Sequence, residues 1–164
     1  MDVERLTRLF RDLGARDPEL WAQSQADEGI NQLHRYMFLR QAWGLVVPDQ
    51  DQSWIDAQIA YSAARPDEPF AGVGAALRRL IEAGADRQLL SDVVRGMQAE
   101  LLSGLCYLLE DPSIEEAEAA HIGWRLVETD EDYNPTGTPI GGLHESVLET
   151  DPTGREMRPR EGTR

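Results

Sequence analysis

The stretch from Arg87 to Leu109, RQLLSDVVRGMQAELLSGLCYLL, says most about the fold of this 164-residue chain. Its large apolar residues recur every three or four positions, which is the period of an α-helix. They are Leu90, Val93, Val94, Met97, Leu101, Leu105 and Leu108. Asp86 can cap the start of this helix, and Gly96 and Gly104 would let a neighbouring helix approach closely. We therefore expect a long helix over 87–109 that forms the spine of the core.

The sequence before this stretch carries the same helical period. Apolar residues at three-and-four spacing, with capping residues and glycine or proline stops, predict five further helices. These cover residues 2–13, 18–28, 30–45, 54–64 and 70–83. From Ile30 to Leu45 the apolar residues occupy too wide an arc for a helix with one exposed face, so we expect this helix to lie centrally. The expected fold class is mainly α, a helical bundle of about five to seven helices.

The character of the sequence changes after Asp111 and Pro112. Residues 113–122 have the composition of an acidic helix, and residues 124–127 have that of a strand. An apolar-Glu-Thr-Asp sequence that leads to Pro-Thr-Gly then occurs twice, within 127–137 and within 148–154. Turn residues of this kind favour a short β-hairpin or two exposed, irregular loops.

We expect a single, mostly helical domain over residues 1–151. It would consist of a helical core, 1–111, and an acidic C-terminal subregion, 112–151. A chain of this length buries roughly 70% of its unfolded surface, so it needs no disulfide or metal to fold. Residues 152–164 are polar and rich in Arg with no periodicity, and we expect them to form a disordered tail.

Most of the formal net charge of −14 lies near the C-terminus. Residues 110–151 hold twelve acids and one base, Arg125, which gives a net charge of −11. A negative field opposes binding to nucleic-acid phosphates, which requires basic contacts, and it speeds association with a basic partner. We therefore expect no nucleic-acid binding. The alternative interpretation is that the acidic face only keeps the chain soluble.

Missing residue types exclude several classes of function. All 16 basic residues are Arg, so the chain has no Schiff-base, P-loop, kinase or Ser-Lys lysine. The single cysteine, Cys106, excludes an internal disulfide and any multi-cysteine metal site. No stretch approaches the ~20 apolar residues of a membrane span, and charges occupy the N-terminus where a signal peptide is apolar. We expect a bacterial, cytoplasmic protein with no membrane contact and no cofactor.

Two alternatives to a binding protein remain open. Glu115 and Glu118 would share one face of the acidic helix, where they and His121 could hold a divalent cation in a carboxylate- or histidine-based hydrolase. The stretch 141–146, GGLHES, crowds an imidazole, a carboxylate and a hydroxyl, but neighbouring residues seldom face one another. We interpret it as a glycine turn that enters a capped element, and we assign no catalytic residue. The second alternative is a homo-oligomer, such as a homodimer, built on the apolar arc of residues 30–47.

We favour a small acidic interaction protein over an enzyme. It would bind a basic protein partner, as an inhibitor, an immunity-type protein or an adaptor does. The acids would steer the encounter, and Trp124 and Tyr133 would be aromatic anchors. The residues expected to contact the partner are Glu115, Glu116, Glu118, Trp124, Glu128, Asp130, Glu131, Asp132 and Tyr133.

Overall fold

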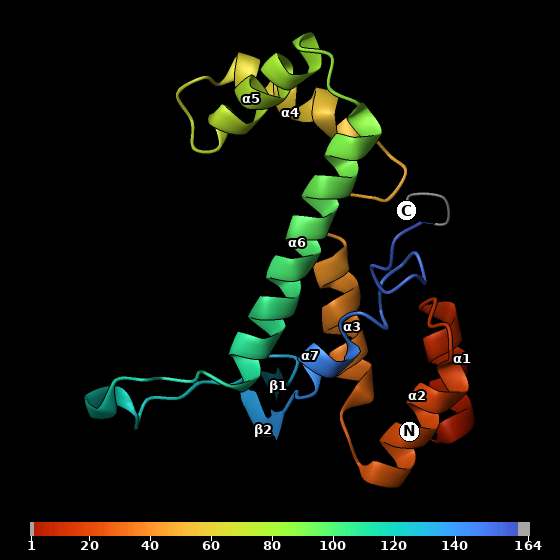
Figure 1. Ribbon diagram of the computed structural model, residues 1–164. Coiled ribbons are helices and arrows are strands. Elements are labelled where there is room, and N and C mark those ends of the chain that lie inside the picture. The colour runs from red at the N-terminus through yellow and green to blue at the C-terminus, as the bar shows by residue number, and fades with distance from the viewer. Residues whose placement is uncertain (1, 161–164) are drawn as a thin grey trace. The chain divides into compact units, whose positions relative to one another are not determined.

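The computed structural model describes residues 2–160 of the chain (Figure 1). The described part is mainly helical, with a short two-stranded antiparallel hairpin near the C-terminus, which confirms the expected fold class. The helices are α1 (Val3–Asp12), α2 (Pro18–Glu28), α3 (Gln32–Trp43), α4 (Ser53–Ala64), α5 (Ala71–Glu82), α6 (Arg87–Glu110) and α7 (Leu143–Ser146). The remaining elements are a 3-10 turn, η1 (Ala117–Ala119), and the strands β1 (Val127–Thr129) and β2 (Pro135–Pro139). None of the described helices is long and apolar enough to cross a membrane.

The described chain divides into two compact units. Residues 2–44 and 101–160 belong to the first, which we call the terminal unit, and residues 45–100 form the second, the central unit. Helix α6 contributes residues to both. The acidic segment, the hairpin and α7 all belong to the terminal unit, so every candidate site described below lies within that unit.

An aromatic cluster joins the first three helices of the terminal unit. Asp2 caps α1, since its carboxylate accepts a hydrogen bond from the backbone N–H of Arg5 at 2.8 Å. Phe10 of α1 is fully buried against Trp21 of α2 and Tyr36 of α3. The three ring centroids lie 5.4 to 5.9 Å apart, and Tyr36 meets both other rings edge-on. Contacts of this geometry stabilise aromatic pairs beyond the area they bury.

Helix α3 packs against α7 through its wide apolar arc. Leu39 of α3 and Leu143 of α7 are completely buried, and the indole N–H of Trp43 donates to the backbone oxygen of Val147 at 2.8 Å. Tyr36 and Ala42 of the same arc are buried as well. Much of the arc on which the homo-oligomer alternative rests is therefore used inside the chain itself.

The central unit is a pair of helices in close contact, α4 and α5, joined to the start of α6. A Cβ atom on Gly74 would lie 2.0 Å from the backbone oxygen of Gln58 and 2.2 Å from the hydroxyl oxygen of Ser62. Only glycine therefore fits this crossing of α5 over α4. The Ser62 hydroxyl donates to the backbone oxygen of Ala71 at 2.5 Å, which fixes the start of α5 on α4.

Helix α6 confirms the long helix expected over 87–109, but most of its apolar residues do not lie in a core. Several of them are 44 to 66% exposed, namely Val93, Met97, Leu101, Leu105 and Leu108. The opposite face is the buried one, with Ser91, Arg95, Ala99 and Cys106. Two hydrogen bonds hold that face, from the Trp54 indole to Ser91 at 2.9 Å and from Arg95 to the Val47 oxygen at 2.7 Å. The expectation that this helix forms the spine of the core was wrong, because the spacing of apolar residues does not indicate which polar residues find partners in other segments.

Asp151, in the second copy of the repeated sequence, organises a turn at the end of the described chain. Its carboxylate is almost fully buried and accepts hydrogen bonds from the backbone N–H and hydroxyl of Thr153, at 3.1 and 2.6 Å, and from the N–H of Met157 at 3.1 Å. Arg16 donates to the backbone oxygen of Gly154 at 2.9 Å. The tail predicted over 152–164 starts in this turn, and its residues 161–164 lie outside the described ones.

Candidate functional site

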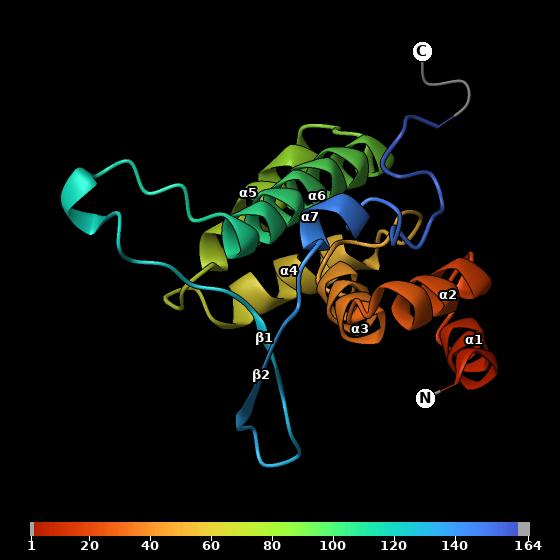
Figure 2. The same ribbon diagram turned by 90° about the horizontal axis from the view of Figure 1, so that it is seen from below.

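The acidic segment between α6 and β1 does not form the helix predicted over 113–122. Only η1 is helical, and it buries no residue. Figures 1 and 2 show the segment as an excursion from the end of α6, with η1 at its far end. Glu115, Glu116 and Glu118 are exposed there. A short helix needs packing to form, and neighbouring like charges disfavour it, so the local helical composition is not sufficient.

Trp124 fixes the return of this segment to α6. Its indole N–H donates to the backbone oxygen of Leu108 at 2.7 Å, which satisfies a carbonyl near the end of the helix. The side chain is still 43% exposed. Trp124 therefore anchors the segment and leaves part of its ring open to solvent.

The hairpin begins three residues later than the predicted strand and is tied to α3. Val127 pairs with Pro139 and Thr129 with Pro135 across the antiparallel ladder. The carboxylate of Glu128 accepts a hydrogen bond from the side chain of Asn31 at 3.1 Å and lies 3.4 Å from His34 Nε2. Glu128 was predicted to contact a partner, but its carboxylate holds the hairpin on the first turn of α3.

Asp130 organises the turn at the hairpin tip. One of its carboxylate oxygens accepts the backbone N–H groups of Asp132 and Asn134, both at 2.9 Å. Hydrogen bonds lower the pKa of Asp130 below its ordinary value. The bond from the Asn134 backbone has the largest effect, and the bond from the Asn134 side chain follows. The Asp130 side chain is therefore a structural part of the tip, although Asp130 is exposed.

The tip presents an aromatic ring between carboxylates. Tyr133 is 86% exposed and has a positive φ of 64°, a conformation that residues with a side chain seldom adopt. Its backbone N–H donates to the backbone oxygen of Asp130 at 3.1 Å, which holds that conformation. Glu131 and Asp132 precede it and are exposed. Figure 2 shows the hairpin as an arm whose turn lies at its far end from α7.

The hydrolase alternative loses the helix on which it rested. Without an acidic helix, Glu115 and Glu118 do not share a helical face with His121 at its end. Among residues 2–160 no group of three or more His, Cys, Asp or Glu side chains is placed to hold a metal ion. A metal-dependent hydrolase therefore remains an alternative, but the described residues contain no candidate metal site for it.

The GGLHES stretch forms the turn and short helix that its glycines indicated. Gly142 has a φ of 72°, and α7 follows it. The carboxylate of Glu110 caps α7 by accepting the backbone N–H groups of Leu143 and His144, at 3.0 and 3.1 Å, and it bonds to the His144 ring. Burial acts to raise the pKa of Glu110, but the bonds from His144 and Leu143 outweigh it and lower that pKa. The Ser146 hydroxyl accepts a hydrogen bond from Arg35 at 3.4 Å.

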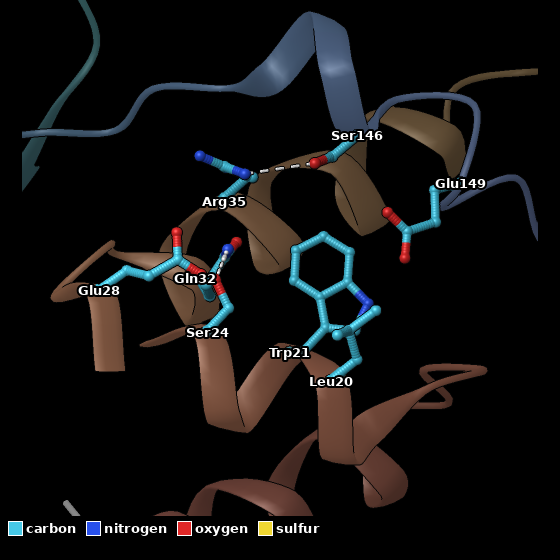
Figure 3. A pocket seen from close by; sticks show the side chains of 8 residues that line it. All are labelled: Leu20, Trp21, Ser24, Glu28, Gln32, Arg35, Ser146 and Glu149. Atoms are coloured by element: carbon cyan, nitrogen blue, oxygen red, sulfur yellow. Dashed lines mark hydrogen bonds between the residues drawn. The ribbon is translucent and has the colours of Figure 1, made fainter. Parts of the chain in front are cut away.

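A pocket of about 240 Å³ lies between α2, α3 and the end of α7 (Figure 3). Its polar lining includes Gln32 and Arg35 of α3, Glu28 of α2 and Glu149 after α7. Sequence reasoning missed this site, because these residues come from three separate segments and match no motif. Their proximity depends on the packing of α3 against α2 and α7.

Comparisons with models of protein families, with curated proteins and with solved structures find no match to this chain. Function must therefore be inferred from the arrangement of its residues. Three of the nine side chains predicted to contact a partner, Trp124, Glu128 and Asp130, form bonds that shape the acidic surface. The other six are exposed on the segment around η1 and at the hairpin tip: Glu115, Glu116, Glu118, Glu131, Asp132 and Tyr133.

Proposed function

We propose that this protein docks onto a basic protein partner through its hairpin tip and the acidic segment that precedes it. The contact residues would be the six exposed side chains named above. Trp124, Glu128 and Asp130 would position them. Inhibitors, immunity-type proteins and adaptors act by binding of this kind, and the chain would belong to that functional class.

The exposed ring of Tyr133 is the observation that carries the proposal. A tyrosine supplies a large contact area at low cost in conformational entropy, and tyrosine is enriched among the residues that dominate binding energy. Here the ring is 86% exposed and its backbone is held in a rare conformation by Asp130. Strained backbone of this kind persists only where its surroundings enforce it, and it gathers at functional sites. A tip that is ordered before binding loses little entropy when it binds.

Charge supports the same surface. Residues 110–151 carry a net charge of −11, and Glu131 and Asp132 immediately precede Tyr133 in the sequence. Complementary charge accelerates encounter and rejects partners of the wrong sign, and added salt screens both effects. A basic partner should therefore bind quickly at low salt and more weakly as the salt concentration rises.

The proposal can be tested by affinity capture from a lysate of the source organism at low and at high salt. The bait is the full chain or a variant in which Glu115, Glu116, Glu118, Glu131 and Asp132 are changed to Gln or Asn. A matched control removes five exposed acids elsewhere: Glu4, Asp12, Asp67, Glu82 and Glu100. The control keeps the overall charge of the variant but retains the acidic surface.

We expect one basic protein to be retained by the full chain and by the control, and to be lost with the five-acid variant and at high salt. The purified partner should then bind the full chain directly. Equal retention by the variant and the control would mean that net charge alone attracts the protein, and would refute docking at this surface.

A further inference from the structure

The pocket of Figure 3 contains a buried acceptor with no partner. Gln32 is only 6% exposed, and its side-chain N–H donates to the hydroxyl of Ser24 at 2.7 Å. Its side-chain oxygen, Oε1, receives no hydrogen bond within the described part of the chain. Figure 3 shows this oxygen directed toward the space between Arg35 and the ring of Trp21. Buried polar groups are almost always paired, so an unpaired acceptor on a pocket wall points to a donor from outside.

Two carboxylates add further acceptors to the same pocket. Glu28 and Glu149 both line it, and Glu28 is exposed. Neither carboxylate has a hydrogen bond or an ion pair within residues 2–160. Glu149 is half-buried, and this burial raises the pKa of its carboxyl group. The positive charge of Arg16 lowers that pKa, but by less than burial raises it. A carboxylate that has lost water without gaining a partner is stabilised by a cation.

Arg35, the cation in the pocket wall, is already engaged elsewhere. Its Nε donates to the backbone oxygen of Gly141 at 2.5 Å, and its Nη2 lies against Gly142, where a Cβ atom would be 2.1 Å away. The charged groups that line the pocket are two carboxylates, Glu28 and Glu149, against this one guanidinium. Glu145 and Glu110 also act electrostatically on Arg35. Negative charge therefore prevails around the pocket, so it disfavours an anion and favours a cation.

An aromatic wall separates the two sets of acceptors. Figure 3 shows the ring of Trp21 between Gln32 and Glu149. Leu20 lies beside it and is 65% exposed at the pocket mouth. The combination of apolar wall and acceptors suits a ligand that has a short hydrocarbon stem and a charged, hydrogen-donating head. Contact of such a head with the indole would add a cation–π interaction.

We propose that this pocket binds an alkylguanidinium or alkylammonium cation. The N–H groups of the cation donate to Gln32 Oε1 and to the carboxylates of Glu28 and Glu149, and its stem packs on Trp21. The cation is either a small free molecule or an arginine or lysine side chain of another protein. None of these four residues belongs to the proposed docking surface, so either proposal can fail without the other.

The test is a titration of the isotope-labelled full chain, followed by NMR at the side-chain amide of Gln32 and the indole N–H of Trp21. The first ligand is butylguanidinium, and its neutral isostere butylurea measures the contribution of charge. A short peptide with one central arginine measures whether a protein side chain can enter. The variants are Glu149→Gln, Gln32→Leu and Gln32→Glu, and Glu4→Gln is the control for loss of one charge. Circular dichroism verifies that each variant is folded.

We expect saturable binding of butylguanidinium, with butylurea bound at least about tenfold more weakly because it lacks charge-assisted hydrogen bonds. Glu149→Gln and Gln32→Leu should each weaken binding by about fivefold or more, Gln32→Glu should retain it, and Glu4→Gln should leave it nearly unchanged. If the peptide also binds, the source is a protein side chain; if only butylguanidinium binds, the source is a free cation. If neither butylguanidinium nor the peptide binds saturably, or if butylguanidinium and butylurea bind equally well, the proposal is refuted. If Gln32→Leu does not fold, Glu149→Gln still decides.

Discussion

The carboxylate of Asp130 accepts hydrogen bonds from both the backbone and the side chain of Asn134, at 2.9 Å and at 3.2 to 3.3 Å. The same carboxylate accepts the backbone N–H of Asp132 at 2.9 Å. These bonds close the hairpin tip around the residue between them, Tyr133. The backbone turn that presents this exposed ring is therefore closed on both sides of Tyr133 by one ionised side chain.

Removal of that side chain should loosen the tip. In Asp130→Ala the backbone N–H groups of Asp132 and Asn134 lose the carboxylate that accepts their hydrogen bonds. We expect their exchange with solvent to become roughly tenfold faster, as loss of about 1.4 kcal/mol would produce. Hydrogen exchange followed by NMR measures this. Glu131→Gln is the control and should leave both rates unchanged, and equal rates in Asp130→Ala would contradict the role of Asp130.

Acid should open the same turn. The hydrogen bonds from Asn134, and secondarily from Asp132, lower the pKa of Asp130 below its ordinary 3.8. A carboxyl with a lowered pKa contributes stability above its ordinary pKa and loses it as the pH falls through the lower, folded value. The amide shift of Asn134, followed by NMR as the pH is lowered from neutral, should therefore titrate with a midpoint below 3.8. A midpoint at or above 3.8 would show that these bonds do not form in solution.

Gly142→Ala should destabilise the terminal unit through Arg35. Alanine at a φ of 72° is strained, and its Cβ would lie 2.1 Å from Arg35 Nη2 and so displace a buried guanidinium. Gly29→Ala is a matched control, since Gly29 has a φ of 67° and open space around it. We expect a loss of about 1 kcal/mol for Gly29→Ala and of roughly 2–4 kcal/mol for Gly142→Ala in urea denaturation. Equal losses would mean that Arg35 moves freely.

The exposed face of α6 gives a further stability prediction. Leu101 is 64% exposed, whereas Leu39 of α3 is fully buried. Leu39→Ala should lower the free energy of unfolding by roughly 2–5 kcal/mol, and Leu101→Ala should lower it by less than about 1 kcal/mol. Urea denaturation of both variants tests this. A large loss for Leu101→Ala would show that this face of α6 is covered in solution.

The sequence predicted the first six helices because their signals are local. Asp2 caps α1, and Pro18 stands at the start of α2, where its missing N–H costs nothing. Gly29 ends α2 in the left-handed conformation that glycine adopts freely. Such signals act within a few residues, so one chain is sufficient to recognise them.

The predictions that were wrong depended on contacts between segments distant in the sequence. The stretch 113–122 has the composition of a helix, but it has no surface to pack on and repels itself, and only η1 forms. On α6 the period was recognised, but the buried face is the one whose Arg95 and Ser91 find partners in other segments. Composition could not reveal those partners.

The two candidate sites also differ in how far local sequence signals reveal them. The acidic surface is contiguous in sequence, so its charge and its aromatic residues can be recognised from the order of the amino acids alone. The structural roles of Glu128 and Asp130 cannot, because they depend on α3 and on the geometry of the turn. The pocket of Gln32 and Glu149 was missed altogether, since 116 positions of sequence separate these two residues.

Docking through the hairpin tip is tested most directly by the affinity of the captured basic partner for Tyr133→Ser, measured by calorimetry beside the full chain. This variant changes no charge and removes only the ring at the tip. If the tip is the docking surface, affinity should fall by roughly tenfold or more, as for a residue that dominates an interface. Tyr107→Ser, a second exposed tyrosine, should not lower it. An unchanged affinity in Tyr133→Ser would contradict docking through the hairpin tip.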